Sequence, residues 1–281
     1  MSFIDAHVHV WTPDTAHYPL AAGYKREDMK PASFTPEELF KHCKPAGVDR
    51  INLIQMSFYG FDNRYMLDMM ALYKDAFVGT AVIDPLGDAP DKLMTELARK
   101  RVRAFRIYPD LGKLPPARWL EPAGYARMFA AGAKNNQAMS CLIAPDALPE
   151  LDRMCAKFPD TPVIIDHLCR IGLNGKIEDK DIDALCGMAG HKRVMVKVGA
   201  FYALGKKRPP YLDLAPLIQR VVQAFGVRRC MWESDCPFQV VEHKYQDSID
   251  LVRKRLDFLT DEDREWLLHR TAEEFLFKNK A

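Results

Sequence analysis

Short apolar runs alternate with segments of helical spacing along the whole chain. Each run is too short for a helix and is rich in Val, Ile, Phe or Met, which favours β-strands. The predicted strands are Phe3–Val10, Arg50–Gln55, Phe77–Ile83, Arg103–Tyr108, Met139–Ile143, Val163–Leu168, Val194–Gly199 and Cys230–Asp235. The predicted helices are a segment starting at Pro36 with Thr35 as its N-cap, then Asn63–Lys74, Ala89–Lys100, Pro122–Lys134, Asp146–Lys157, Asp179–Gly190, Leu214–Phe225, Tyr245–Leu256 and Asp261–Phe277.

This order of elements decides the fold class. Eight strand–helix units in 281 residues predict an α/β protein, a single-domain (β/α)8 TIM barrel over residues 1–281. An open, doubly wound sheet is the alternative. It is disfavoured because no Gly-x-Gly-x-x-Gly motif follows the first strand. The longest irregular segment, Trp11–Ser33, follows strand one and is expected at the C-terminal mouth of the barrel, where sites are built.

The pair His7-Val8-His9 is the most informative local motif. Side chains two residues apart in a strand point to the same face, so both imidazoles project side by side from a rigid support. That geometry suits a divalent metal ion, or a carbonyl oxygen that needs two donors. Two histidines satisfied by hydrogen bonds in the core are the alternative.

Polar residues recur at the ends of six predicted strands. A core strand has no structural need for them, because unpaired buried polar atoms cost several kcal/mol. In a barrel the strand ends converge, so together they predict a site. Lys197 and Glu233, on neighbouring strands, are expected to form an internal ion pair. The residues are Asp5, His7 and His9 on one face of strand one, Gln55, Arg106 and Tyr108, Asp166 and His167, Lys197, and Glu233 to Asp235.

The amino-acid composition limits the classes of binding partner that we expect. The 40 basic residues balance 38 acidic ones without a basic stripe, and no apolar run is long enough for a membrane span. We therefore expect a small-molecule substrate and neither nucleic acid nor membrane as a partner. The seven cysteines are scattered and lack a Cys-x-x-Cys pair, and the N-terminus has no secretory signal pattern, so reduced thiols and a cytoplasmic location are expected.

The motifs at the strand ends resemble the amidohydrolase superfamily. Within it, they are similar to the amidohydrolase-related branch, which includes 2-pyrone-4,6-dicarboxylate lactonase, sugar and muconate lactonases, and aminocarboxymuconate-semialdehyde decarboxylase. The resemblance implies a hydrolase that opens a cyclic ester of a small carboxylic or sugar acid. The matching segments are Ile4–His9, Ala104–Ile107, Pro162–Leu168, Met195–Gly199, Trp232–Pro237 and Arg270–Leu276.

The departures from the superfamily pattern also matter. Members with two metals usually carry a bridging lysine on strand four, and Arg103–Tyr108 has none. The strand-five histidine of the decarboxylase is missing from Met139–Ile143, which counts against decarboxylation unless the Cys141 thiolate replaces it. Glu233 stands where the branch usually has a glycine.

The resemblance implies roles for named residues. Asp235 is the expected general base toward water, or toward metal-bound water, and His167 is the second expected catalytic residue. Either His7, His9, His167 and Asp235 hold one divalent metal ion, with zinc expected, or the histidines act without metal by donating to the substrate carbonyl. Arg106 is expected to pair with a substrate carboxylate. The further expected substrate-binding residues are Tyr108, Arg170, Gln55 and Tyr202.

Two other functions stay open. A decarboxylase could use the same fold with one metal ion and a protonating histidine. A catalytically silent barrel could bind a metabolite, although such a barrel has no reason to keep both a base and electrophilic groups.

Overall fold

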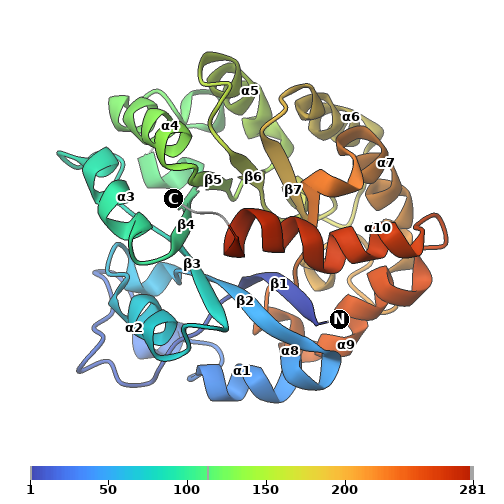
Figure 1. Ribbon diagram of the computed structural model, residues 1–281, viewed down its shortest axis with the longest axis horizontal. Helices are drawn as coiled ribbons and strands as arrows, with labels where there is room; N and C mark the ends of the chain where they lie inside the picture. The colour runs from blue at the N-terminus through green and yellow to red at the C-terminus, as the bar shows by residue number, and fades with distance from the viewer. Residues whose placement is uncertain (1, 113, 279–281) are drawn as a thin grey trace.

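The computed structural model describes residues 2–112 and 114–278. Eight parallel strands pair in sequence order, β1 to β8. A parallel bridge between Val8 and Cys236 joins the last strand's segment to the first, and the Asp235 amide donates to the His7 carbonyl at 3.0 Å. This is the (β/α)8 barrel predicted (Figure 1). The strands are β1 (Phe3–Val8), β2 (Val48–Ile54), β3 (Phe77–Ala81), β4 (Val102–Ile107), β5 (Ala138–Cys141), β6 (Val163–Ile165), β7 (Val194–Val198) and β8 (Cys230–Trp232).

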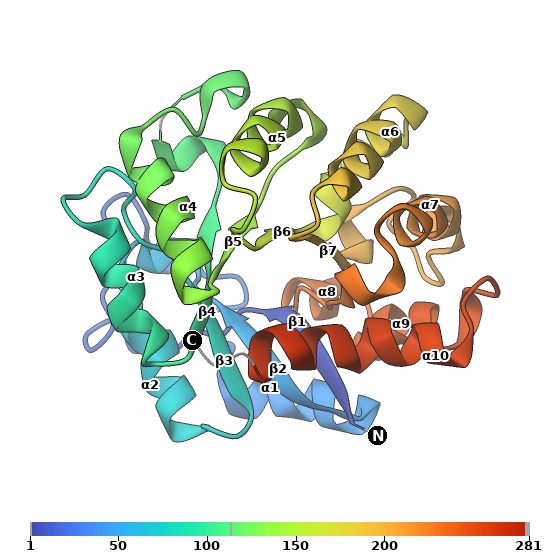
Figure 2. The same ribbon diagram turned by 45° about the horizontal axis from the view of Figure 1, so that its top comes forward.

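Helices surround the strands (Figure 2). The predicted N-cap is confirmed, because the Glu38 amide donates to Thr35 Oγ1 and the Glu38 carboxylate accepts from the Thr35 amide. A short helix, α8, follows strand eight and was not predicted. The helices are α1 (Pro36–Cys43), α2 (Arg64–Leu72), α3 (Pro90–Ala98), α4 (Ala123–Asn135), α5 (Leu148–Lys157), α6 (Asp179–Gly187), α7 (Ala215–Phe225), α8 (Phe238–Glu242), α9 (Tyr245–Asp250) and α10 (Asp261–Glu265).

The barrel interior changes from apolar to polar along the strands. One buried cluster near the start of the strands holds Ile4, Ala6, Val78, Ala104, Ala138, Ile164, Met195 and Met231. Because side chains alternate with a period of two, the residue two positions further along each strand faces the same way. On strands β3 to β8 those residues are Thr80, Arg106, Ser140, Asp166, Lys197 and Glu233. The polar layer therefore lies toward the C-terminal mouth.

The C-terminal helix closes the opposite mouth. α10 continues through the π-helical turns Trp266–Arg270 and Glu273–Phe277. Ala272 and Leu276 join the apolar cluster inside the barrel. Figure 1 shows this helix lying across the end of the barrel that faces the viewer. The helix therefore covers the N-terminal end of the barrel interior.

All eight strands end before their predicted last residue, and two of them, β6 and β8, end three residues early, just before residues of the site. β6 stops at Ile165, and the four residues from His167 to Arg170 have φ between 50° and 57°. β8 stops at Trp232, and Asp235 has φ 59°. Left-handed backbone costs roughly 1–2 kcal/mol per non-glycine residue, so these turns are strained. The strain lies where His167 and Asp235 are turned toward the cavity.

Candidate active site

A cavity of about 310 Å³ opens at the C-terminal ends of the strands. A second hollow of about 460 Å³ adjoins it, and the two share Ser57, Arg106 and Leu142. The first cavity is lined by His9, Met56, Ser57, Arg106, Leu142, His167, Arg170, Leu173, Ala200, Tyr202, Ala203, Leu204, Asp235 and Phe238. Half of these lining residues are apolar, as expected for a site that binds a small organic molecule.

Three groups meet at one edge of this cavity. His7 Nε2 lies 3.2 Å from His9 Nε2. Asp235 Oδ1 lies 3.6 Å from His7 Nε2 and 3.4 Å from His9 Nε2. Strand one and the turn after strand eight therefore bring the three side chains together.

Their neighbours determine which ring nitrogens carry hydrogen. His9 Nδ1 lies 3.0 Å from the Ile54 carbonyl oxygen, so it donates and leaves Nε2 as an acceptor. The Lys197 ammonium, which can only donate, lies 3.1 Å from His7 Nδ1. Burial lowers the pKa of both imidazoles, and the Lys197 charge lowers the pKa of His7 further. In this arrangement His7 Nε2–H donates to His9 Nε2.

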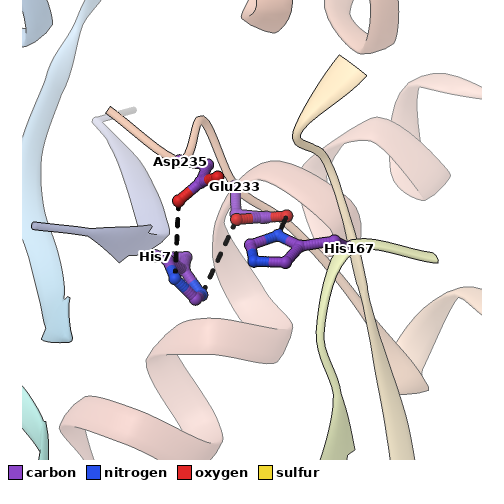
Figure 3. A group of neighbouring side chains, drawn as sticks. All are labelled: His7, His167, Glu233 and Asp235. Carbon is purple, nitrogen blue, oxygen red and sulfur yellow. Dashed lines mark hydrogen bonds and ion pairs between the residues drawn. The ribbon is translucent and has the colours of Figure 1, made fainter. Parts of the chain in front are cut away.

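His167 forms a buried pair with Glu233. His167 Nδ1 lies 2.6 Å from Glu233 Oε1 (Figure 3). Its Nε2 lies 3.3 Å from Arg106 Nη2. Burial raises the pKa of Glu233 to about 7. Burial alone would lower the pKa of His167, but the charges of Glu233 and Asp235 raise it. The pair thus presents the Nε2 edge of His167 to the cavity beside a guanidinium group.

Asp235 offers one free carboxylate oxygen. Tyr202 donates to its Oδ2 at 2.7 Å, whereas Oδ1 is buried and accepts no hydrogen bond from the described residues. Burial opposes ionisation of this carboxyl, but His167, His9 and His7 together hold its pKa well below the ordinary value. Asp235 is therefore a carboxylate at neutral pH, with Oδ1 facing His7 and His9.

The expected ion pair between Lys197 and Glu233 is wrong. Lys197 pairs instead with Asp166, at 2.9 Å from Oδ1, and Ser140 donates to the same oxygen at 2.8 Å. Asp5 also differs from expectation. It accepts from the Ser234 amide and the Tyr245 hydroxyl, away from the cavity, because the register of β1 is irregular between Asp5 and Val8.

The site fits a divalent metal ion. Tetrahedral ligands bound at about 2.05 Å lie about 3.3 Å apart, which matches the His7, His9 and Asp235 triangle. A group of His7, His167, Glu233 and Asp235 also has ligand atoms within 4.8 Å of one another. Asp235 Oδ1 and Glu233 Oε2 are both buried without hydrogen-bond donors among the described residues. Such oxygens favour a cation or a donor from water or substrate.

The predicted substrate-binding residues divide between the two hollows. Arg170 and Tyr202 line the first, Tyr108 and Gln55 line the second, and Arg106 borders both. The Gln55 amide nitrogen is less available to a substrate, because it donates to the Asp62 carbonyl at 2.7 Å. The sequence interpretation missed Met56 and Ser57, although the position of both directly after strand two was a usable signal.

Comparison with known proteins shows the family to which the chain belongs. A family model described as amidohydrolase matches residues 4–278. The chain belongs to the amidohydrolase family. It is 26% identical over 243 residues to an L-fucono-1,5-lactonase of Burkholderia ambifaria, covering 83% of this chain and 80% of that protein. It is 23% identical over 268 residues to a 4-sulfomuconolactone hydrolase of Hydrogenophaga intermedia, covering 92% and 83%.

Solved amidohydrolase structures share the fold. A putative 2-pyrone-4,6-dicarboxylic acid hydrolase from Pseudomonas putida superimposes with a TM-score of 0.81 at 21% identity, over 98% of this chain and 97% of that one. An amidohydrolase from Burkholderia multivorans with bound zinc gives 0.83 at 19% identity, over 98% and 99%. At these identities the likeness shows the fold alone. None of the described helices has the length and apolar character needed to cross a membrane.

Proposed function

We propose that this amidohydrolase is a lactonase that opens a cyclic ester of a small acid. The observation that carries the proposal is a buried carboxylate oxygen, Asp235 Oδ1, placed beside three imidazoles at the mouth of a small cavity. A base next to groups that polarise a carbonyl is what hydrolysis of an ester requires. The named lactonases among its relatives support the same reaction class.

The proposed reaction adds one water across the ester. Asp235 Oδ1 takes a proton from water as the water oxygen attacks the carbonyl carbon. Arg106 Nη2 donates to the position we assign to the carbonyl oxygen, where negative charge develops, and His167 Nε2, 3.3 Å from that nitrogen, accepts a hydrogen bond from the attacking water. The ring C–O bond then breaks, and Asp235 returns its proton to the leaving oxygen. The product is an open hydroxy acid.

The remaining predicted residues bind the rest of the substrate. Arg170 lines the cavity, and no described residue forms an ion pair or hydrogen bond with its side chain. A guanidinium beside an apolar wall suits a substrate carboxylate, so Arg106 and Arg170 are our candidates for that role. Tyr202 orients Asp235 through Oδ2. Tyr108 and Gln55 would meet a substrate that extends into the second hollow.

A single zinc ion is the metal that we propose for this site. His7, His9 and Asp235 would hold it, with His167 close by, and a catalytic zinc site keeps one position for water or substrate. Its contribution there would be Lewis-acid polarisation of a carbonyl oxygen. Metal-free action of the same histidines is the competing version.

Decarboxylation is the weaker candidate. β5 contributes no histidine, and burial raises the pKa of the Cys141 thiol well above its ordinary value. The Cys141 thiol also lies outside the group of neighbouring candidate ligands found among the described residues, so strand five would supply no ligand. All seven cysteines are free, which agrees with the cytoplasmic location that we propose.

The test is hydrolysis of a panel of carboxylated and sugar lactones in water enriched in ¹⁸O. We expect at least one lactone to open, with one labelled oxygen in the new carboxylate. Release of carbon dioxide from a β-carboxy-enal, with every lactone left intact, would instead establish the decarboxylase. Repeating the lactone assay after chelation and zinc readdition separates the zinc version from the metal-free one.

A further inference from the structure

Glu233 is a buried carboxylate that the proposed reaction does not use. It is fully buried and lies between two imidazoles (Figure 3). Its Oε1 is 2.6 Å from His167 Nδ1, and its Oε2 is 3.8 Å from His7 Nδ1. Burying a carboxylate costs several kcal/mol unless its partners compensate, so its retention here calls for a role.

The fold reserves space for this side chain. Gly199 follows strand seven, and a Cβ there would lie 2.5 Å from Glu233 Cγ and 2.1 Å from the Glu233 carbonyl oxygen. The Glu233 amide also donates to the Val198 carbonyl at 3.3 Å. The backbone and the Cγ atom of Glu233 are thus both fixed, and its carboxylate is held at one place beside His167.

His167 needs such a partner more than the other two histidines. It begins the left-handed turn after β6, whereas His7 and His9 belong to or directly follow a strand. Within the described residues its ring has two hydrogen-bond partners, Glu233 at Nδ1 and Arg106 at Nε2. Arg106 can only donate, so it gives the Nδ1 hydrogen no acceptor. Glu233 is the only described residue that does.

We propose that Glu233 is a positioning residue for His167. It holds the hydrogen on the Nδ1 side of the ring and keeps Nε2 directed into the cavity beside Arg106. For what Nε2 then does, the inference rests on the lactonase proposal. The same orientation serves with or without a metal ion, because metal-binding histidines also donate their other N–H to a carboxylate or carbonyl.

Three variants separate the hydrogen bond from packing. Glu233→Ala removes the carboxylate, Glu233→Gln keeps an acceptor oxygen, and Glu150→Gln removes a buried carboxylate outside the site, where Glu150 pairs with Arg153. Long-range ¹H–¹⁵N spectra of the histidine rings report where the hydrogen lies, without any substrate. We expect Nδ1–H at His167 in the wild type, in Glu150→Gln and in Glu233→Gln, and a mixture of tautomers in Glu233→Ala.

Kinetics on an accepted lactone give the second readout. Losing such an outer partner typically costs about 10–100-fold, and we expect Glu233→Ala to lose that much in kcat with little change in KM. Sodium formate should restore part of the kcat of Glu233→Ala in a saturable way and leave the wild type unchanged. A residue that only supports packing would not respond to formate.

Two results would overturn the inference. One is an unchanged His167 tautomer in Glu233→Ala, and the other is a kcat within twofold of the wild type. If Glu233→Ala does not fold, Glu233→Met fills the same space without an acceptor and faces the same two criteria. If the wild type opens no lactone at all, the proposed function fails, while the ring spectra still decide whether Glu233 positions His167.

Discussion

At the scale of single residues, the two oxygens of Asp235 have different tasks. Oδ2 accepts from Tyr202 at 2.7 Å, and Oδ1 is free toward His7 and His9. Removing the hydroxyl in Tyr202→Phe should leave the carboxylate charged but less well oriented. We expect kcat to fall about tenfold, at the lower end of the range for outer partners, with unchanged thermal stability.

Steady-state kinetics of Tyr202→Phe beside Tyr211→Phe check this. Tyr211 is also buried, and its hydroxyl accepts from Gln239 outside the cavity. Equal losses in both variants would mean that the tyrosine hydroxyls act only through folding.

Lys197 and Asp166 form a buried ion pair under the site. Both side chains are fully buried and lie 2.9 Å apart. Lys197→Met would remove the nearest counter-charge of the buried carboxylate and leave only Arg106, at 3.8 Å from Oδ2, so we expect a loss of up to about 3–5 kcal/mol of unfolding free energy. Lys180→Met, which breaks an exposed pair with Glu178, should cost far less, because solvent screens that pair. Urea unfolding measures both, and comparable losses would contradict this account of the polar layer.

At the scale of elements, the C-terminal helix closes the barrel with Leu276, which is fully buried against the interior cluster. Leu276→Ala should therefore lower the free energy of unfolding by about 2–5 kcal/mol. Leu72→Ala, at a position that is 66% exposed on α2, should change stability by less than about 0.5 kcal/mol. Chemical denaturation compares them, and a small effect at Leu276 would show that the helix is not needed to close the barrel.

The same helix is tied to β2 by Glu273, which gives stability a pH dependence. Partial burial works against ionisation, but Lys278, Arg50 and His269 lower the pKa of Glu273 to about 2. A lowered carboxyl pKa stabilises the fold above the ordinary value near 4.5, and this contribution fades as pH falls toward 2. Glu273→Gln should lower the free energy of unfolding by up to about 1 kcal/mol at pH 7. The difference from the wild type should shrink below pH 4.5.

Urea unfolding between pH 3 and 7 follows this difference. The neighbouring exposed Glu274, changed to Gln, serves as the control. A difference that stays constant across that range would exclude the ion pair as its source.

At the scale of the whole molecule, the periodicity of apolar residues was sufficient to predict the barrel. Eight strands and their order follow from alternating runs, and the polar strand ends followed from the same pattern. The turns at His167 and Asp235 were not predictable, because left-handed backbone at non-glycine residues is decided by tertiary contacts. The partner of Lys197 depended on which inward side chains are adjacent across the barrel, which the sequence does not show.

The proposed metal site depends on the assembled barrel, since its candidate ligands come from opposite ends of the chain. We expect one zinc ion per chain. His9→Ala should weaken binding by more than the roughly 10–100-fold that loss of an outer partner costs. His191→Ala, at a surface ion pair with Asp152, should not change it. Equilibrium dialysis with a competing chelator measures this, and binding that survives in His9→Ala would place the ion elsewhere.

The most direct test of the catalytic account compares kcat/KM of the wild type, Asp235→Asn and Asp179→Asn on a lactone that the wild type opens. Asp179 is exposed on α6, where it pairs with Arg220, and it lines neither of the two hollows. We predict a loss of about 10²–10⁴-fold for Asp235→Asn, with its fold intact, and no loss for Asp179→Asn. A folded Asp235→Asn variant that turns over at the wild-type rate would contradict the account.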